Sequence, residues 1–543
     1  MKQLFTFYEK NKEVQDVIQG LQSGLKEQLI SGLVGSSRTV LFSSIQEKLN
    51  RTQCIVTANL LSAQKLYQDY IHWIDEKSVW LYPAEEIGMI DVEAASPELK
   101  AARIEILGQL IEENVKVLIV PVSGLFQILP PKEVWKDFHI PIQVGMDLDW
   151  QQFLQRLQDM GYEKEEVVSS PGTYCMRGGI IDIYPLTEEN PVRIELFDTE
   201  IDSIRSFDTE TQRSIQSLDK VMIMPATEWL RGKEIDRYAA KRLKSFIDIN
   251  KQKIKNQESQ EKVILFLNEM IHRFENHMEI PHFFKFAALL YEKPASLLDY
   301  MPADVIVFAD ELPRVMEQGL RLEREAEEYT VAKIEQGTYF YGGMLGHAFS
   351  DLVRARRFQM IYLSTFVSRV ALTSPQNLVS IASRTVQDYH GQLHRLKSEM
   401  SRYNKGKYFV YLFVKSKDRL QKVASVLEDF SIDYYFLSDD ETGVLGKINM
   451  AIGELQNGFE VPSMRLVVMS EADLFKKFNS KPRMKRQKIS NAERIQSYQD
   501  LKVGDYVVHI NHGVGKFLGI RTLEMDGIHK DYLHIAYQGD DVL

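Results

Sequence analysis

Apolar and polar positions follow two different periods along the chain, and this pattern indicates several α/β segments. Short apolar runs are expected strands, and amphipathic stretches such as Pro97–Glu113 are expected helices. The first part of the chain has expected strands at Thr39–Phe42, Gln53–Thr57, Val79–Tyr82 and Val117–Val120. Strands that alternate with helices favour a parallel sheet with crossover helices. Residues 1–138 are therefore predicted to begin an α/β domain.

Residues 139–222 have a denser pattern of short strands. The expected strands are Thr173–Tyr184, Val192–Asp198 and Glu200–Phe207, and turn residues separate them. This pattern predicts a small α+β insertion. Helical patterns then return around one apolar strand, Val305–Phe308. We expect residues 223–348 to complete the domain that residues 1–138 begin.

The remainder of the chain divides into three predicted parts. Residues 349–475 alternate again, with strands at Phe409–Val414, Tyr434–Leu437 and Leu466–Met469, and predict a separate α/β domain of unassigned role. Residues 476–492 form a basic linker, in which Lys476–Lys488 has seven basic residues and no acidic one. A plain tether is favoured there, and contact with phosphate is the alternative.

Residues 493–543 are β-rich and complete the predicted α/β multidomain architecture with a small C-terminal β-barrel. Strands are expected at Tyr506–Ile510, Gly515–Arg521 and Tyr532–Tyr537. A further strand is expected after Asp540–Asp541, because an open barrel edge is prone to aggregation. We therefore expect the barrel to be truncated and the chain to be a fragment of a longer protein.

Composition narrows the classes of function. Of the 543 residues, 44% are hydrophobic and 26% charged, and 66 basic against 76 acidic residues give a net charge of −10. A chain this acidic is no general nucleic-acid coat, so DNA contact requires a local basic patch. Cys54 and Cys175 are far apart, which argues against a disulfide framework or a zinc ribbon. Without a signal-like start or a long apolar run, a cytoplasmic monomer with no membrane contact is expected.

One loop has the position and part of the sequence of a phosphate-binding loop. Ser31–Thr39 reads SGLVGSSRT, whereas a working loop has the pattern GxxxxGK[ST]. Gly32 and Thr39 fit, but Ser37 replaces the second glycine and Arg38 replaces the lysine. That glycine allows N–H groups to point at phosphate, and a planar guanidinium does not replace the compact lysine ammonium. We expect a vestigial site, with weak ATP binding as the alternative.

An acidic pair supplies half of a second nucleotide motif. The apolar strand within Asp304–Glu311 ends in Asp310 and Glu311, as a Walker B strand does, although such a pair is also a common helix entry. Without the lysine we expect no hydrolysis there, and no other region offers a nucleophile with a base or a His/Cys metal cluster. His509 and His512 are interpreted as structural. No catalytic residue, metal or cofactor is expected in this chain.

Three apolar residues have both a packing and a binding interpretation. Alternation along Val192–Asp198 puts Arg193, Glu195 and Phe197 on one face of a strand. An arginine beside a phenylalanine is typical of an interface hot spot, whereas a strand covered on both sides would place Phe197 in a small second core. Near the C-terminal end, Leu523 and Ile520 bracket polar residues, and inward packing is favoured on sequence alone.

Three groups of motifs resemble the transcription-repair coupling factor (Mfd) family. Met176–Pro185, Val192–Asp198 and Ile201–Asp208 resemble the UvrA-binding domain shared by UvrB and that family. Leu297–Pro302 leading into Asp310–Glu311 resembles the matching UvrB segment. Gly504–His509 with His512–Phe517 resembles the CarD-like RNA-polymerase-interacting domain, which UvrB lacks. The order of these motifs spans nearly the whole chain and points to the amino-terminal half of the family.

The resemblance implies a role in transcription-coupled nucleotide excision repair. It implies that Arg177, Arg193 and Phe197 contact UvrA, with an arginine fork paired to a carboxylate, and that the surface of Leu523 and Ile520 meets the RNA polymerase β subunit. Members of the family also carry an ATP- and magnesium-dependent double-stranded-DNA translocase, whose motifs this sequence does not contain. The alternatives are a UvrB-type, ATP-dependent damage-loading helicase, and a polymerase-binding regulator without a repair role.

Overall fold

The computed structural model describes residues 3–84, 97–209, 211–367, 369–438, 441–475, 506–509, 513–525 and 528–536. Among these residues, no helix is long and apolar enough to cross a membrane. They divide into two compact units, and the strands from Tyr506 onward belong to the second. The basic run Lys476–Lys488, His512 and Asp540–Asp541 lie outside the described residues.

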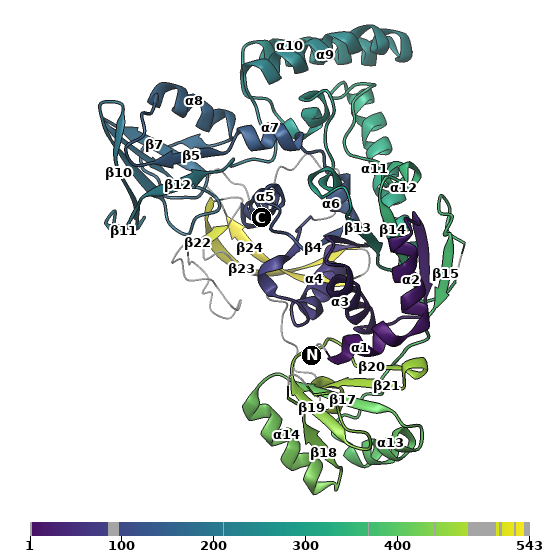
Figure 1. Ribbon diagram of the computed structural model, residues 1–543. Coiled ribbons are helices and arrows are strands. Elements are labelled where there is room, and N and C mark those ends of the chain that lie inside the picture. Colours follow the sequence, from purple (N-terminus) through teal and green to yellow (C-terminus); the bar gives the residue numbers. More distant parts are fainter. Residues whose placement is uncertain are drawn as a thin grey trace. The chain divides into compact units, whose positions relative to one another are not determined.

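The first α/β domain is built on a seven-stranded parallel sheet (Figure 1). Its strand order is β15 (Asn377–Ser380), β1 (Glu27–Ser31), β14 (Gln359–Ser364), β13 (Ile306–Ala309), β2 (Gln53–Thr57), β4 (Val117–Pro121) and β3 (Val79–Leu81). Every neighbouring pair is parallel. The expected parallel sheet is confirmed, and it includes β13, which follows the insertion in the sequence.

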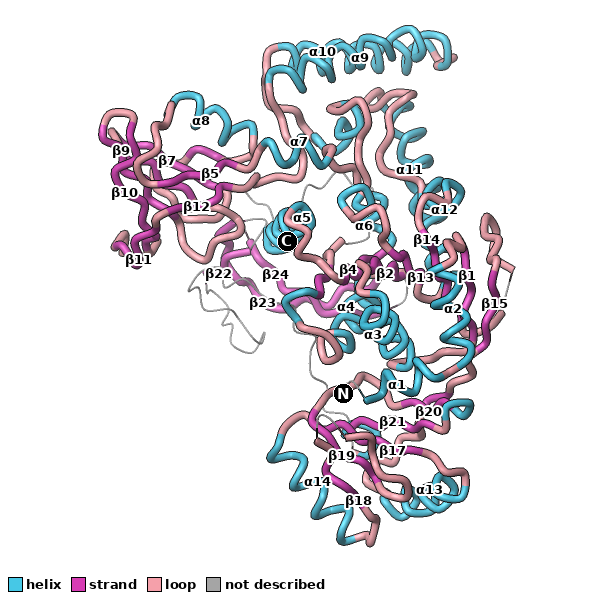
Figure 2. The backbone as a smooth tube through the Cα atoms, in the orientation of Figure 1, coloured by secondary structure: helices cyan, strands magenta, loops and turns pink. Residues whose placement is uncertain are grey.

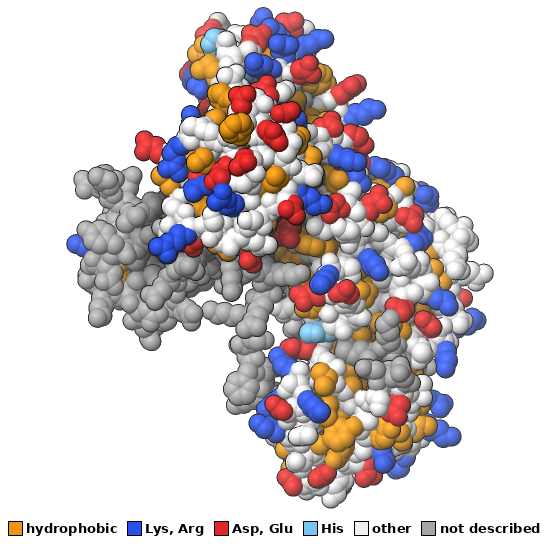
Figure 3. Space-filling model, turned by 60° about the vertical axis from the view of Figure 1, so that its left-hand side comes forward, with side chains coloured by type: hydrophobic (Ala, Val, Ile, Leu, Met, Phe, Trp, Pro, Cys, Tyr) orange, Lys and Arg blue, Asp and Glu red, His pale blue; other side chains and the backbone are white. Residues whose placement is uncertain are grey.

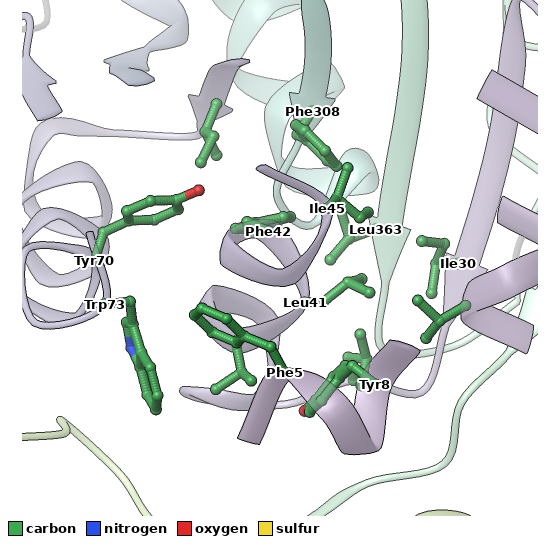
Figure 4. Packing of buried hydrophobic residues seen from close by; sticks show 14 of the residues in the cluster. Phe5, Tyr8, Ile30, Leu41, Phe42, Ile45, Tyr70, Trp73, Phe308 and Leu363 are labelled. Carbon is green, nitrogen blue, oxygen red and sulfur yellow. The ribbon is translucent and has the colours of Figure 1, made fainter. Parts of the chain in front are cut away.

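Helices from both halves of the sequence surround this sheet (Figure 2). They are α1 (Gln3–Lys10), α2 (Lys12–Gln22), α3 (Ser37–Leu49), α4 (Leu60–Tyr70), α5 (Pro97–Ile111), α6 (Val122–Phe126), α11 (Leu312–Gln336) and α12 (Phe349–Ala355). Helix α7 (Lys132–Asp137) instead packs its Val134 against the apolar cluster of the helical hairpin that follows the insertion. The 3₁₀ helix η1 (Glu76–Ser78) precedes β3. In the core, Phe42 of α3 contacts Phe308 of β13 with 4.7 Å between ring centroids, and the hydroxyl of Tyr8 donates to the carbonyl of Ser37 (Figure 4).

Two expectations for this domain are wrong. Thr39–Phe42 is not a strand but lies in α3, where almost every side chain from Ser37 to Gln46 is buried. A helix buried all round has no amphipathic period, and periodicity alone cannot distinguish it from a buried strand. The boundary at residue 348 is also wrong, because β14 and β15 continue the first sheet on either side of β1. Strand β1 was not predicted, because its five residues include the polar pair Glu27 and Gln28.

The expected insertion is a mostly antiparallel sheet that follows β5 (Ile140–Gln143) and α8 (Trp150–Asp159). Its order is β11 (Ser214–Leu218), β10 (Glu200–Phe207), β9 (Val192–Phe197), β8 (Ile180–Ile183), β7 (Thr173–Arg177) and β6 (Glu163–Lys164). Strand β12 (Lys220–Ile223) returns to pair with β5. The expected strand Thr173–Tyr184 is thus two strands, which reverse at Gly178, where φ is +61°.

A long helical hairpin follows the insertion and consists of α9 (Lys233–Lys253) and α10 (Gln257–Glu275). Its apolar residues pack against the 3₁₀ helix η2 (Phe283–Leu289), with Phe274 and Phe286 in an edge-to-face contact. Asn256 caps α10 by accepting a hydrogen bond from the amide of Ser259. The 3₁₀ helix η3 (Leu297–Tyr300) then leads into β13.

The second α/β domain begins after β15. Its sheet has the order β16 (Arg384–Thr385), β20 (Phe459–Val461), β21 (Leu466–Ser470), β17 (Phe409–Val414), β19 (Ile448–Ile452) and β18 (Tyr434–Phe436). Helices α13 (Leu393–Lys405), α14 (Lys417–Asp429) and α15 (Glu471–Leu474) and the 3₁₀ helix η4 (Pro462–Met464) complete it. All three expected strands are confirmed.

The second unit contains a three-stranded antiparallel sheet, β22 (Tyr506–His509), β23 (Gly513–Met525) and β24 (Ile528–Ala536). Ile520 and Leu523 lie on β23, where their backbones pair with Leu533 and Lys530 of β24. Their side chains lie outside the described residues. The three expected strands are present, whereas the closed barrel stays a prediction.

Candidate protein-interaction site and an occupied nucleotide cleft

The degenerate phosphate loop lies where a functional one would lie, between the end of β1 and the start of α3. Gly32 and Gly35 have φ of +91° and +55°, which glycine adopts without steric cost. The loop therefore keeps the strand–turn–helix geometry of a nucleotide site. The loop differs from a functional phosphate loop in the hydrogen bonds that its own groups make.

Protein groups already satisfy several of the donors that would face a phosphate. The N–H of Val34 donates to the hydroxyl of Ser383 at 2.8 Å, and the hydroxyl of Ser37 donates to the carbonyl of Val34 at 2.7 Å. The hydroxyl of Thr39, at the position of a magnesium ligand in a working loop, donates to the carbonyl of Ser36 at 2.7 Å. The loop thus bonds within the protein and does not present these groups to a ligand.

Arg38 forms ion pairs with the two acidic residues at the end of β13. Its Nη1 lies 2.7 Å from Oδ1 of Asp310 and 3.4 Å from Oε1 of Glu311. Burial raises the pKa of Asp310, and the charge of Arg38 opposes that rise. The carboxylates that a Walker B motif directs at magnesium are therefore both paired with one guanidinium of the same chain. The structure brings together the six residues predicted as a degenerate nucleotide site: Gly32, Ser37, Arg38, Thr39, Asp310 and Glu311.

The second α/β domain supplies part of the wall of this cleft. A cavity of about 260 Å³ is lined by Arg38, Asp69, Asp310 and, from the second domain, Gln456 and Asn457. The carboxylate of Asp69 accepts from the hydroxyl of Ser36 and from the N–H of Gln456, both at 2.6 Å. Burial raises the pKa of Asp69 to about 7. Asp69 was not predicted as a site residue, because a single acidic residue within α4 has no recognisable motif.

The open face of the insertion sheet carries the other predicted site. The alternation predicted for β9 is confirmed, because Val192 and Ile194 are buried whereas Arg193, Glu195 and Phe197 lie on the opposite face. The side chain of Phe197 is 80% exposed, so its placement in a second core is excluded. Ile180 of β8, which pairs with Glu195, is a further exposed apolar residue on this face.

Both predicted arginines contact one buried carboxylate. Arg193 binds Asp182 through two hydrogen bonds, at 2.7 Å from Nε and 2.9 Å from Nη2, and Nη2 of Arg177 lies 3.3 Å from the same carboxylate. The side chain of Asp182 is 1% exposed and that of Arg177 is 55% exposed. The guanidinium of Arg193 also lies over the ring of Phe207, 4.5 Å from its centroid. The bonds to Asp182 raise the pKa of Arg193.

This geometry revises the expected role of Arg193. Its fork was expected to meet a carboxylate of a partner, but that fork is occupied within the chain by Asp182. A second ion pair, from Arg205 to Glu195 at 2.6 Å, fixes the adjacent part of the face. Asp182 was not predicted as a site residue, although it lies within the motif Met176–Pro185. An acidic residue within an apolar strand has no assigned partner until the fold is known. Arg177, Ile180 and Phe197 remain the exposed groups.

No metal site accompanies either feature in the described part of the chain. Among those residues, no group of three or more His, Cys, Asp or Glu side chains could hold a metal ion. Cys54 and Cys175 are free and buried.

Known proteins match both the parts and the whole of the chain. The UvrB interaction domain family matches residues 140–229, and the CarD-like/TRCF RID domain family matches residues 501–543. The transcription-repair-coupling factor of Bacillus subtilis (strain 168) is 41% identical over 544 residues, which cover 100% of this chain and 46% of that protein. Those of Staphylococcus haemolyticus and Staphylococcus aureus (strain MRSA252) are 36% and 34% identical, over 95% and 99% of this chain and 44% and 46% of those proteins.

The chain thus spans a little under half the length of these curated relatives. A solved structure titled "Structure of S. tokodaii Xpd4" covers 81% of the chain, but with a TM-score of 0.21 and 10% identity, values too low to indicate a shared fold. Two domain families in the expected order, together with similarity to transcription-repair-coupling factors along the whole chain, show that the chain belongs to the transcription-repair-coupling factor family and corresponds to the amino-terminal region of its members.

Proposed function

We propose that this chain is a recruitment scaffold that binds UvrA through the open face of its insertion sheet and the RNA polymerase β subunit through β23 and its neighbours. The observation that carries the proposal is Phe197, a large aromatic side chain that is 80% exposed at the end of β9. A monomer does not gain stability from such exposure, whereas a rigid aromatic anchor is typical of a binding hot spot. The match of residues 140–229 to the UvrB interaction domain family supports the same face.

The three predicted residues have different roles in this proposal. Phe197 supplies the apolar anchor, and Arg177 supplies a charge that acidic groups of UvrA can reach, because more than half of its side chain is exposed. Arg193 is a positioning residue, since its bonds to Asp182 hold β8 and β9 in register beneath the contact surface. The CarD-like match at residues 501–543 supports polymerase as the second partner, with Leu523 and Ile520 as the proposed contact residues.

The chain would perform this role without turning over ATP. This proposal is supported by the occupied cleft, in which Arg38 pairs with Asp310 and Glu311 and the N–H of Val34 donates to the hydroxyl of Ser383. The alternative, a UvrB-type ATP-dependent helicase, needs these same groups to bind phosphate and magnesium. In this proposal, ATP and magnesium are assigned to the translocase of full-length family members, which is also assigned the main contact with double-stranded DNA.

A bridging experiment tests the scaffold directly. Immobilised UvrA should retain polymerase β subunit only when the chain is added. Phe197→Ala should lose UvrA but still bind β subunit, and Leu523→Arg should lose β subunit but still bind UvrA. A single variant that abolishes both contacts while its melting curve is unchanged would contradict two independent surfaces. Retention of β subunit without the chain would remove the need for a bridge.

A further inference from the structure

Helix α9 carries a stripe of basic side chains that the proposed function does not use. The α9 stripe is defined as Lys233, Arg237, Lys241, Lys244 and Lys251, all of them exposed. Their spacings of four, four, three and seven residues place them on one face of a helix with 3.6 residues per turn. At about 1.5 Å per residue, the stripe runs for about 27 Å along the helix.

The hairpin holds this face outward. The side of α9 next to the stripe, centred about 100° around the helix from it, is buried through Ala239, Ala240 and Leu243, which belong to the apolar cluster shared with α10 and η2. Arg242, which is not part of the stripe, donates to the carbonyls of Ala288 and Tyr291 at 2.9 and 3.1 Å and fixes the helix against the chain beneath it. The stripe therefore lies on a supported, regular helix.

The charge of the stripe is poorly compensated. Helix α9 contains seven basic residues and three acidic ones, in a chain whose net charge is −10. Within the described residues, Lys244 pairs with Glu275 at 2.5 Å and Lys251 approaches Asp248 at 3.8 Å, whereas Lys233, Arg237 and Lys241 have no ion pair. Acidic and basic side chains are interspersed over the face in Figure 3. On the α9 stripe, by contrast, the five cations have one acidic residue of the helix among them, Asp248.

The side chains of the stripe indicate which class of ligand it can bind. The nearest exposed large apolar residue of α9, Ile249, lies about 130° around the helix from the centre of the stripe, at 100° per residue. A protein interface requires apolar or aromatic anchors at its centre, which the stripe does not contain. A nucleic-acid backbone requires only cations that replace its counterions. The row of cations on a rigid helix matches the regular phosphates of a duplex.

We propose that the α9 stripe binds the sugar–phosphate backbone of double-stranded DNA without reading its sequence. Each cation replaces a condensed counterion at one phosphate, so binding weakens steeply as salt rises. This contact belongs to the hairpin alone. It does not depend on the UvrA face or on the nucleotide cleft.

The test compares two triple variants of the whole chain with equal charge. Lys233→Gln/Arg237→Gln/Lys241→Gln removes the unpaired part of the stripe. Lys397→Gln/Lys417→Gln/Lys422→Gln removes three exposed lysines of the second α/β domain. Lys476–Lys488 is the same in both, so any phosphate binding by that segment is a constant background. Binding of a fluorescently labelled 30-base-pair duplex is measured by anisotropy at several salt concentrations, and circular dichroism confirms that both variants fold.

The stripe variant should bind the duplex at least about tenfold more weakly than wild type at low salt, with the slope of log K against log salt reduced by about 2–3. The control variant should bind like wild type, and Phe197→Ala should leave DNA binding unchanged. Equal weakening in both triple variants would assign binding to overall charge, and no weakening in the stripe variant would place DNA elsewhere. If poly-glutamate of equal charge competes as well as unlabelled duplex, the ligand is an acidic protein and the proposal fails.

Discussion

Replacement of Arg38 tests whether the former nucleotide cleft has become a structural ion pair. In Arg38→Met the carboxylate of Asp310, with a side chain only 9% exposed, loses the guanidinium 2.7 Å away. At that distance the gross attraction is about 6 kcal/mol in an effective dielectric of about 20. Desolvation offsets part of it, and Arg38 is itself 19% exposed, so we expect a net loss of about 2–4 kcal/mol.

The pH dependence of this loss has a definite sign. Burial raises the pKa of Asp310 and Arg38 opposes the rise, so the variant should have a higher Asp310 pKa than wild type. A carboxyl whose pKa is raised in the folded state stabilises that state below its unfolded pKa, and the contribution disappears as pH rises through the folded pKa. The destabilisation of Arg38→Met should therefore be smallest near pH 4 and grow toward pH 8.

Urea denaturation of a double-mutant cycle provides the measurement. Asp310→Asn in the Arg38→Met background should restore most of the lost stability, because the uncompensated charge is gone. Arg354→Met, which removes an exposed pair with Asp351 in the same domain, is the matched control and should cost less than about 1 kcal/mol. If Arg38→Met costs no more than the control, or if the two cleft substitutions are simply additive, the reasoning about this ion pair is refuted.

Three further predictions concern the cleft and the polymerase contact. The pKa of Asp69 is raised to about 7, so wild type loses stability as pH rises from about 4 to 7. Asp69→Asn should remove this pH dependence and stabilise the protein above pH 7 by up to about 4 kcal/mol. A series of denaturation curves at different pH values checks both effects. The chain should show no ATPase activity above background in a coupled assay, and stimulation by duplex DNA would contradict that expectation. Leu523→Arg should abolish capture of polymerase β subunit at an unchanged melting temperature, because burying a guanidinium in the contact costs about 2–4 kcal/mol. Unaltered capture would exclude Leu523 from the polymerase contact, and loss of folding would assign it to a hydrophobic core.

The sequence predicts the architecture well where strands are short, apolar and separated by turns. Strands β9 and β10 of the insertion and β17, β18 and β21 of the second α/β domain lie where alternation and apolar runs indicate them, whereas the shorter or more polar strands beside them were not predicted. It fails where burial removes the period, as in α3, and where a strand is half polar, as in β1. It also fails where a sheet is completed from distant sequence, because only the pairing of β14 and β15 with β1 shows that the first domain extends to residue 380.

The candidate sites likewise have features that a local sequence motif predicts and features that depend on the fold. The substitutions at Ser37 and Arg38 are visible in a single loop, so a degenerate phosphate site can be predicted from sequence. That Arg38 neutralises Asp310 cannot, because the two residues are 272 positions apart. The alternation along β9 predicts that Arg193 and Phe197 share a face, but not that Asp182 already occupies the fork of Arg193. Pairings that depend on the fold become visible only when the strands are placed side by side.

UvrA binding by the exposed face around Phe197 carries the proposed scaffold function, and calorimetry with purified UvrA measures that contact. Phe197 is 80% exposed, so Phe197→Ala should leave the melting temperature unchanged. Truncation of a hot spot costs at least about 2 kcal/mol, so the same variant should bind UvrA about thirtyfold more weakly or worse. Arg193→Ala should weaken binding by a similar factor, but with some loss of stability, because Asp182 then lacks its partner.

The matched control is Leu265→Ala, which removes a large apolar side chain that is 72% exposed on α10, outside the insertion. It should bind UvrA with wild-type affinity. The account predicts a dissociation constant raised about thirtyfold for Phe197→Ala and unchanged for Leu265→Ala. Wild-type affinity in a folded Phe197→Ala variant would contradict the assignment of this face to UvrA.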